Sequence, residues 1–584
     1  MYRVGNDSSS TYSNQGSGSR STTISKKTTE STGSLQTSST SHDDSQGSSK
    51  QNELDIKISQ LGLYGRQKET RTIRKCLDDL ETTGEKKLVY ISGLSGTGKT
   101  ALAATIADSV VEKNGIFAMG KFDQKLRDEP YAGIASAGRH ICGEILHRKK
   151  SSDPMDFENV RKMIIKNIGS ELPTLAMILP EIEDIVGSSS DLSAQENSAG
   201  GDYGAIKERL NNAIRTFFRT VSTFFKPFVM VLDDIQWADL PSINLMEVLM
   251  TDEASSNFML VALYRSNEVD ETHVVTKMIK ALDEKEQDLG FDTTKIEVGD
   301  LKMEQVSEIL ADLLHLPSYR TSDLSDIIHK RTGGNAFFVL NFIDMLKNEN
   351  LVAYSKVEKC WVWDESEIEL ETIATDNVVG LLQQRMKSLP KAMQEVLQLA
   401  SCLGASFQED VLGKVVGDYS VSQDNGPVAG QLSKWLTKAI EQGFIKMDSV
   451  GYRWIHDKVQ EAALSITSGT DLNKMRYQVG SIMLRRLSRN EMDHALFVVV
   501  NLLNAGIGTE MSPESALSLA ELNLRAAQRA MKVSGFEVAS RYSDIGIGLL
   551  PGYHWQSHYE LSLKLHTLAT QAHGVSGNVE TMQA

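Results

Sequence analysis

The eight residues from Gly93 to Thr100, GLSGTGKT, constrain this chain more than any other segment. They fit the pattern GxxxxGK[ST] of a P-loop, in which a glycine-rich turn presents backbone N–H groups to phosphates. A short apolar run at Lys87–Ser92 precedes the turn, and an alanine-rich helical pattern at Lys99–Glu112 follows it. The segment therefore predicts a strand, a phosphate-binding loop and a helix in that order, with a nucleoside triphosphate as ligand.

The side chains of this loop have expected roles. Lys99 is expected to reach the β- and γ-phosphates, and the Thr100 hydroxyl to ligate Mg²⁺. The glycines let the backbone bend so that successive N–H groups face the phosphates. We expect ATP or ADP to contact the following residues: Gly93, Ser95, Gly96, Thr97, Gly98, Lys99, Thr100 and Ala101.

A P-loop also needs a carboxylate from a neighbouring strand, because Mg²⁺ prefers carboxylate and water oxygens in octahedral geometry. The apolar run Phe228–Leu232, followed by Asp233 and Asp234, supplies one. We expect Asp233 to hold the magnesium shell and Asp234 to orient or deprotonate the attacking water. Adjacent carboxylates at a strand end also fit an ordinary turn, but the P-loop upstream favours the catalytic interpretation.

Further short apolar runs predict more strands, and segments with a helical spacing of apolar residues separate them. They lie at Ile116–Phe122, Phe228–Leu232 and Phe258–Tyr264. Strands that alternate with helices favour an α/β fold with a mainly parallel sheet. The strand signal fades after Gly299, so we expect helices and one small mixed segment beyond it, ending in a nearly all-helical region.

The composition limits the classes of protein to which the chain can belong. A formal net charge of −16 weighs against nucleic-acid binding, whose affinity comes mostly from Lys and Arg contacts to phosphates. Four widely spaced cysteines without a CxxC pair predict reduced thiols. The sequence has no run of 18 apolar residues and no signal-peptide pattern, so we expect an intracellular, cytoplasmic protein without membrane contact.

Two segments have the composition of chain without a packed core. Residues 1–52 are dominated by Ser, Thr, Gly, Gln and Asn, and they have few large apolar side chains. Such a segment cannot offset the entropy of ordering its backbone, so we expect a disordered tail. The stretch Gly187–Gly204 is similar in composition and predicts a surface loop.

The residues around Asp234 carry a family resemblance. Residues 233–239, DDIQWAD, resemble the DDxQWAD signature of signal-transducing ATPases with numerous domains, the STAND class, in the branch with an origin-recognition-complex-like AAA ATPase domain. Tyr64, Gly65 and Arg66, with Glu69, resemble the box before the P-loop, which implies that Gly65 and Arg66 help to bind the nucleotide. Residues 121–124, KFDQ, resemble the second-strand segment of the same domain.

Two further segments fall in the order that this branch shows. Val261–Arg265 resembles the sensor strand, whose arginine approaches the γ-phosphate, and the resemblance therefore implies a catalytic role for Arg265. Taken alone, Arg265 fits a solvated surface charge. Residues 334–338, GNAFF, resemble the GNPFF segment of the family's lid, although Ala336 replaces the usual proline.

Residues 378–407 and 452–463 resemble the winged helix that follows in these proteins. In related switch ATPases a His-Asp pair in this domain contacts bound ADP and holds the inactive state. The resemblance therefore implies that His456 contacts the nucleotide. The sequence around His456 also fits a purely structural histidine, and the two interpretations stay open.

The last part of the chain, 519–577, resembles the tetratricopeptide-like (TPR-like) repeats of the same proteins. The repeats end without an evident capping helix, so we expect either a fragment of a longer protein or an apolar face that a partner covers. The predicted domains are a disordered tail at 1–52, a P-loop ATPase core at 53–299, a helical lid at 300–350, a winged-helix-like domain at 351–468 and TPR-like repeats at 469–584.

The function expected from this domain order is an ATP-binding, slowly hydrolysing switch and scaffold, in which the nucleotide controls a protein partner bound to the repeats or self-association of the chain. A DNA-binding replication initiator has the same domain order, but the winged-helix-like segment 378–461 carries nine basic and nine acidic residues, where a DNA reader would be basic. A kinase in this chain is not expected, since it lacks the HRDxxxxN and DFG motifs. A non-catalytic piece of a longer sensor kinase stays an alternative.

Overall fold

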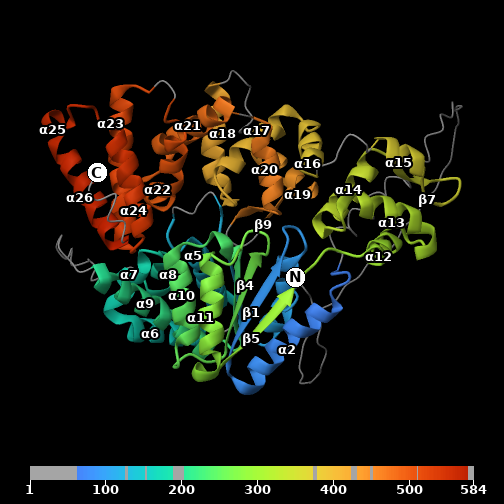
Figure 1. The fold of residues 1–584 in the computed structure, drawn as a ribbon, viewed down its shortest axis with the longest axis horizontal. Coiled ribbons are helices and arrows are strands. Elements are labelled where there is room, and N and C mark those ends of the chain that lie inside the picture. Colours follow the sequence, from blue (N-terminus) through green and yellow to red (C-terminus); the bar gives the residue numbers. More distant parts are fainter. Residues whose placement is uncertain are drawn as a thin grey trace, which may run out of the picture.

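The computed structural model describes residues 62–124, 129–151, 154–187, 203–371, 378–422, 431–447, 451–467, 469–508 and 511–576. The predicted tail at 1–52 lies outside these residues, and so does most of the predicted surface loop at 187–204. Figure 1 shows a sheet covered by helices, with the later helices of the chain arranged in an arc over one end of the sheet.

The core of the first domain is a parallel sheet of five strands in the order β2-β3-β4-β1-β5. Their bounds are β1 Lys86–Gly93, β2 Ile116–Lys121, β3 Phe228–Asp233, β4 Phe258–Arg265 and β5 Phe291–Glu297. The predicted α/β fold with a parallel sheet is confirmed. The first four strands coincide with the predicted apolar runs, whereas the fifth was not predicted.

Alternate residues of the central strands enter two different hydrophobic cores. Leu88 and Tyr90 of β1 pack in one core, and Val89 and Ile91 pack in the other. The first core is completed by α5 (Ala132–Ser151), α9 (Tyr203–Phe224), α10 (Leu240–Thr251) and α11 (Val274–Leu289), and the second by α2 (Gln67–Thr83), α3 (Lys99–Ala104) and α4 (Ala107–Glu112). Burial on both faces explains why these strands are continuous apolar runs in the sequence.

Three helices between β2 and β3 extend the first core toward the C-terminal part of the chain. They are α6 (Pro154–Ile168), α7 (Leu172–Ala176) and α8 (Ile182–Val186), and their apolar residues belong to the same buried cluster as the sheet.

The lid is a helical unit with its own hydrophobic core. It contains α12 (Met303–Leu314), α13 (Ser318–Thr332), α14 (Ala336–Asn348), the hairpin β6 (Val352–Ser355) and β7 (Cys360–Trp363), and α15 (Glu365–Glu371). Trp361 of the hairpin and Ile368 of α15 pack in the same cluster as the three long helices. The packing therefore groups residues up to 371 with the lid, beyond the predicted lid boundary at residue 350.

The next unit combines helices with a small antiparallel sheet in the order β8-β10-β9. Its elements are α16 (Val378–Lys387), α17 (Lys391–Cys402), β8 (Ser406–Phe407), α18 (Glu409–Ser422), α19 (Leu432–Glu441), β9 (Ile445–Met447), β10 (Tyr452–Trp454) and α20 (Asp457–Ser465). The predicted winged-helix-like domain at 351–468 includes these elements and stays a prediction, and we call them the winged-helix-like unit.

The remaining described residues are nearly all helical, as predicted. The helices are α21 (Gly469–Arg486), α22 (Arg489–Asn504), α23 (Pro513–Lys532), α24 (Phe536–Gly548), α25 (His554–Ser557) and α26 (Tyr559–Ser576). One continuous hydrophobic core runs from Leu382 of α16 to Ala572 of α26, so these helices pack directly onto the preceding unit. None of the described helices combines the length and the apolar character that a membrane crossing requires.

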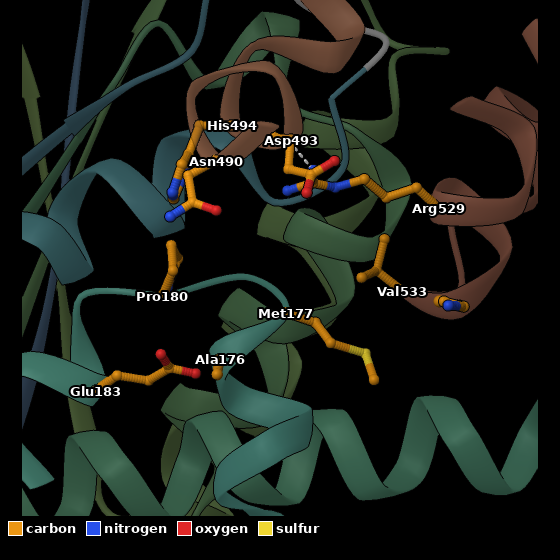
Figure 2. Close-up of a pocket in the computed structure, with 10 residues that line it drawn as sticks. Ala176, Met177, Pro180, Glu183, Asn490, Asp493, His494, Arg529 and Val533 are labelled. Carbon is orange, nitrogen blue, oxygen red and sulfur yellow. Dashed lines mark hydrogen bonds between the residues drawn. The ribbon is translucent and has the colours of Figure 1, made fainter. Parts of the chain in front are cut away.

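The C-terminal helices also contact the first domain. Val533, in the turn between α23 and α24, belongs to the hydrophobic core of the sheet domain. A cleft of about 390 Å³ lies beside this contact. Figure 2 shows its two walls, with Met177 and Pro180 on one side and His494 of α22 and Arg529 of α23 on the other. The two parts of the chain are therefore packed against each other near α7.

Candidate functional site

The predicted phosphate-binding loop connects β1 to α3 in a tightly bent backbone. Gly96 has a φ of 84°, and a Cβ atom at this position would lie 2.5 Å from Oδ1 of Asn335 at the start of α14. A Cβ atom at Gly93 would lie 2.2 Å from the carbonyl oxygen of Val298. The amide of Asn335 donates to the carbonyl oxygen of Ser95 at 2.8 Å, so the lid covers the loop closely. Only glycine fits at these two positions without displacing a neighbour.

Lys99 lies buried at the end of the loop. Its ammonium donates to the carbonyl oxygens of Gly93, at 3.0 Å, and Leu94, at 2.8 Å. Burial lowers the pKa of Lys99, although the nearby carboxylates of Asp233 and Asp234 oppose this effect. The ammonium is thus held against the backbone that the sequence predicts to cradle phosphates.

Thr100 and Asp233 face each other across the predicted magnesium site. The Thr100 hydroxyl donates to Oδ2 of Asp233 at 2.8 Å. Burial raises the pKa of Asp233, and so does the neighbouring negative charge of Asp234. The described residues contain no cluster of three or more His, Cys, Asp or Glu side chains that could hold a metal by themselves. One hydroxyl and one carboxylate fit Mg²⁺, which keeps several waters and takes further ligands from substrate phosphates.

Asp234 follows β3 in a left-handed conformation, with a φ of 57°. Its Oδ1 accepts from Nε2 of Gln236 at 2.9 Å and from Nε of Arg265 at 3.0 Å. Nζ of Lys121 lies 3.1 Å from its Oδ2. Burial alone would raise the pKa of Asp234, but the charges of Lys121 and Arg265 lower it. The carboxylate is therefore held ionised by cations on both sides.

Arg265, the last residue of β4, connects the first domain to the winged-helix-like unit. Its guanidinium bonds Asp234 and also donates to Oδ2 of Asp457 in α20 at 2.5 Å. It stacks over the ring of Trp237 at 4.3 Å and bonds Glu268 at 3.1 Å. Burial would lower the pKa of Arg265, but the two aspartates raise it. One buried side chain thus joins the end of β3 to the start of α20.

His456 caps the N-terminus of α20 and reaches the phosphate-binding loop. Its Nε2 lies 3.4 Å from Oγ of Ser95, and its ring stacks on Phe337 of α14 with ring centres 4.2 Å apart. Its Nδ1 lies 3.1 Å from the backbone N–H of Lys458 and 2.9 Å from Oδ1 of Asp457. The lid, the loop and α20 therefore meet at this histidine.

Arg66 ties the segment before α2 to the loop. Its guanidinium donates to the carbonyl oxygens of Thr97, at 3.3 Å, and Gly299. The neighbouring Tyr64 hydroxyl donates to Asp312 of α12 at 2.7 Å, and burial together with this carboxylate raises the pKa of Tyr64 to about 12. Both side chains thus bind other parts of the protein around the cavity.

These residues line one cavity of about 340 Å³ at the carboxyl ends of the strands. Most of the predicted site residues are among its described lining: Arg66, Ser95, Gly96, Thr97, Gly98, Lys99, Thr100, Ala101, Asp233, Asp234, Arg265 and His456. Gly65 and Gly93 are not among the lining residues, and both act through backbone shape, with φ values of 65° and 152°.

Charge in this cavity opposes the acidity of the whole chain. Six cationic side chains are among its described lining residues, against three carboxylates: Arg66, Lys99, Lys121, Arg265, Lys446 and Arg453 face Asp233, Asp234 and Asp457. A positive excess in a cleft attracts polyanions such as nucleotide phosphates. The net negative charge of the whole sequence therefore does not predict the positive electrostatic potential of this cavity.

Sequence analysis did not assign a site role to several residues that the fold brings here. Lys121 and Phe337 lie in segments that carry the family resemblance, but no pattern marks them individually, and Asp457 was expected only as the partner of His456 in a His-Asp pair. Lys446 and Arg453 are opposite one another on β9 and β10; Lys446 lies outside the recognised segments, and Arg453 lies in one of them without an assigned role. Only the position of the winged-helix-like sheet over the loop reveals them.

Comparisons with known proteins identify the family of the first domain. Residues 62–261 match the family model of the AAA ATPase domain. The resemblance predicted from the P-loop and the DDIQWAD segment is confirmed for this AAA ATPase domain. The strands β1 to β4 and the loop at Gly93–Thr100 all lie within or at the edge of the matched residues.

A curated relative is the hybrid signal transduction histidine kinase G of Dictyostelium discoideum, which is 24% identical over 89% of this chain. The chain spans 18% of the length of that protein. Solved structures include a STAND protein with a tetratricopeptide repeat sensor from Pyrococcus horikoshii (13% identity, 89% of this chain and 63% of that chain, TM-score 0.41) and the Aeropyrum pernix Orc1 protein in complex with DNA (13% identity, 69% and 93%, TM-score 0.29).

Proposed function

We propose that this chain binds ATP and ADP with Mg²⁺ in the P-loop cavity, hydrolyses ATP slowly and acts as a signal-transduction switch. The nucleotide would control how the winged-helix-like unit sits on the AAA ATPase domain. That position in turn would control a protein partner, or a second copy of the chain, that binds the helices α21 to α26.

One observation carries this proposal. The side chains of β10 and α20 line the same cavity as the P-loop, and Arg265 bonds Asp234 and Asp457 at the same time. A ligand that contacts Lys99 and Arg265 therefore changes the surroundings of α20 directly. A ligand shifts a two-state equilibrium only through contacts that differ between the states, and this geometry supplies such contacts.

The residues of the cavity have complementary roles in this proposal. Lys99 and the backbone of the loop bind the phosphates, and Arg265 approaches the γ-phosphate. Thr100 and Asp233 hold Mg²⁺, which would neutralise the charge that develops on the transferred phosphoryl group. His456 contacts the nucleotide from the side of the lid, beside Phe337.

Asp234 orients the attacking water in this proposal, and its contacts favour orientation of the water over removal of its proton. Its Oδ1 already accepts two hydrogen bonds, and its Oδ2 faces Lys121. Its cationic neighbours lower the pKa of Asp234, so the carboxylate is a weak base and proton transfer from the water to it would be slow. A slow rate is what a switch requires, since fast hydrolysis would empty the ATP-bound state.

The nucleotide site is tested by calorimetric titration of the full chain with ATP and ADP. Lys99→Ala should weaken ATP binding by at least about 100-fold, since it removes a buried cation that faces the phosphates. Lys87→Ala is the matched control. Lys87 is buried like Lys99, but it lies in β1 and pairs with Asp292 away from the cavity. Equal ATP affinity of Lys99→Ala and the wild type would refute the site.

The hydrolytic role is tested separately, by phosphate release at saturating ATP. Asp234→Asn keeps the size of the side chain and one of its oxygens, replaces the other oxygen with an amide NH2 group and removes the charge. We expect it to retain ATP binding and to lose hydrolysis. Hydrolysis at the wild-type rate in this variant would exclude Asp234 as the water-orienting group.

The switch is tested by hydrogen exchange of the full chain with ADP and with a non-hydrolysable ATP analogue. Exchange in β10 and α20 should differ between the two ligands, because both elements line the cavity. Asp457→Asn should reduce this difference, since it weakens the bond to Arg265. Identical exchange with both ligands would leave an ATPase without a switch.

We propose that the chain does not bind nucleic acid, and one observation supports this. Lys446 and Arg453, the basic residues of the β9–β10 hairpin among the described residues, line the nucleotide cavity. Their charge is thus directed at the AAA ATPase domain. Titration of a labelled DNA duplex at low salt should give no saturable binding, and tight binding would favour the initiator-like alternative.

A further inference from the structure

Lys121 is the last residue of β2 and reaches the centre of the cavity from the edge of the sheet. In the parallel register it lies beside Asp233 on β3, so its side chain faces the end of that strand. Its ammonium lies 3.1 Å from Oδ2 of Asp234, and the side chain is 20% exposed. The roles proposed above use the P-loop, β3, β4 and α20, and Lys121 enters them only as one of the cations that lower the pKa of Asp234.

The strand order determines which cations lie on either side of Asp234. β3 lies between β2 and β4, so Asp234 receives one cation from each flanking strand, Lys121 and Arg265. Lys121 lies at Oδ2, whereas Arg265 donates to Oδ1 through its Nε at 3.0 Å and to Oδ2 through its Nη2 at the longer distance of 3.4 Å. A carboxylate held at both oxygens cannot rotate freely about its last torsion angle. Together the two strands therefore fix the plane of the Asp234 carboxylate.

The two cations differ in their dependence on the C-terminal part of the chain. Arg265 also bonds Asp457 of α20, so a movement of α20 changes the balance of forces on its guanidinium. Lys121 belongs to the sheet itself, where β2 pairs with β3 over six residue pairs. The contact between Lys121 and Asp234 should therefore persist whether α20 is docked or released.

We propose that Lys121 is a positioning residue for ATP hydrolysis, which holds the Asp234 carboxylate toward the attacking water in both positions of α20. The inference rests on the proposed function, because it assigns Lys121 to the water-orienting role of Asp234. It predicts that Lys121 acts on the chemical step and not on nucleotide affinity. Misplacement of a reacting group by about 1 Å can cost about 100-fold in rate.

The test uses the full chain and separates binding from catalysis. Lys121→Met removes the charge and keeps most of the length of the side chain, and we expect kcat to fall by about 100-fold. KM for ATP and the affinity for ADP should stay within about threefold of wild type, as for an interaction made only in the transition state. Lys121→Arg keeps a cation near Asp234 and should recover at least about a tenth of the wild-type rate.

Two controls distinguish positioning from a loss of structure. Lys87→Met makes the same substitution at another buried lysine that ends on an acidic partner, and it should leave kcat unchanged. In the background of Asp457→Asn, which releases α20 from Arg265, Lys121→Met should still lower kcat by a similar factor. Melting temperatures of all variants identify any that fail to fold, and Lys121→Arg then carries the test.

Three results would overturn the inference. Wild-type kcat in Lys121→Met excludes positioning of Asp234 by Lys121. Loss of ATP binding in Lys121→Met, as expected for Lys99→Ala, would make Lys121 a phosphate ligand instead. Absence of hydrolysis in the wild type would refute the proposed function itself, and the inference with it, whereas the first two results leave that function intact.

Discussion

Asn335 and Gly96 show how single residues join the lid to the nucleotide site. The amide of Asn335 donates to the carbonyl oxygen of Ser95, and Phe337 N–H donates to the carbonyl oxygen of Gly96 at 3.0 Å. The loop is thus hydrogen-bonded to the N-terminus of α14 on one side and bent by glycines on the other. Any side chain at position 96 would compete with the lid for the same space.

We therefore expect Gly96→Ala to weaken ATP binding and to destabilise the protein by about 1–2 kcal/mol, the cost of a non-glycine residue in a left-handed conformation. The added Cβ would lie 2.5 Å from Oδ1 of Asn335 and 3.1 Å from Cβ of Phe337. Titration with ATP and thermal unfolding measure the two effects. Gly143→Ala is the control, because Gly143 lies within α5 and a Cβ there meets no atom within 4 Å. Tight ATP binding by Gly96→Ala would show that the lid can move aside freely.

At the scale of elements, the sequence predicted those strands whose residues form an apolar run. β3 is buried along its whole length, and its apolar run marks it clearly. β5 was missed because five of its seven residues are polar, and only Phe291 and Ile296 are buried. A short strand of that kind is defined by its pairing with β1, which no local pattern reports.

The candidate site shows the same division between local and distant information. The P-loop and Asp233–Asp234 could be predicted because one short motif contains each of them. Asp457 could not be assigned to Arg265 from the sequence, since 192 positions separate them and only the docking of α20 joins them. Lys121 was likewise a residue of a recognised segment without a role until the register of β2 and β3 placed it beside Asp234.

The contact between the lid and the winged-helix-like unit gives a prediction at this scale. Arg385 of α16 bonds Asp344 of α14 at 2.5 Å, and the two side chains are 18% and 20% exposed. The guanidinium also donates to the carbonyl oxygen of Gln442 and lies over the ring of Phe444. Burial lowers the pKa of Arg385 and raises that of Asp344, and the charge of each partner opposes the effect of burial on the other.

Arg385→Met should therefore destabilise the chain by about 1–3 kcal/mol, because it leaves the carboxylate of Asp344 without its buried partner. The double variant Arg385→Met with Asp344→Leu should recover part of this loss, since it removes both charges. Denaturant unfolding of the single and double variants measures the coupling between the two positions. If the two substitutions change the free energy of unfolding additively, the ion pair does not stabilise the contact between α14 and α16.

The whole molecule is arranged so that the C-terminal helices contact the AAA ATPase domain at two places. One contact is the nucleotide cavity, where α20 meets the P-loop. The other is the turn between α23 and α24, where Val533 enters the core of the sheet domain, beside the cleft in Figure 2. Since one hydrophobic core connects α16 to α26, a movement at the first contact must be accommodated at the second.

Gly535 is the residue at which this second contact can be disturbed. A Cβ atom there would lie 2.4 Å from Cγ of Pro130, which follows β2 in the sheet domain. The backbone of Gly535 has no left-handed strain, with a φ of −82°, so a substitution acts through the contact alone. We expect Gly535→Ala to weaken the packing of α24 against the sheet domain and to raise hydrogen exchange in the turn before α24. ATP affinity should be retained, because Lys99 lies in the nucleotide cavity, away from this turn. Gly548→Ala is the control at the other end of α24, where an added Cβ meets no atom within 4 Å. It should change neither hydrogen exchange in the turn nor ATP affinity.

If the nucleotide switch moves the C-terminal helices as one body, Gly535→Ala should also reduce the difference in exchange of α20 between ADP and the ATP analogue. An unchanged difference would mean that α20 moves independently of α21 to α26, and that the helical repeats do not report the nucleotide state.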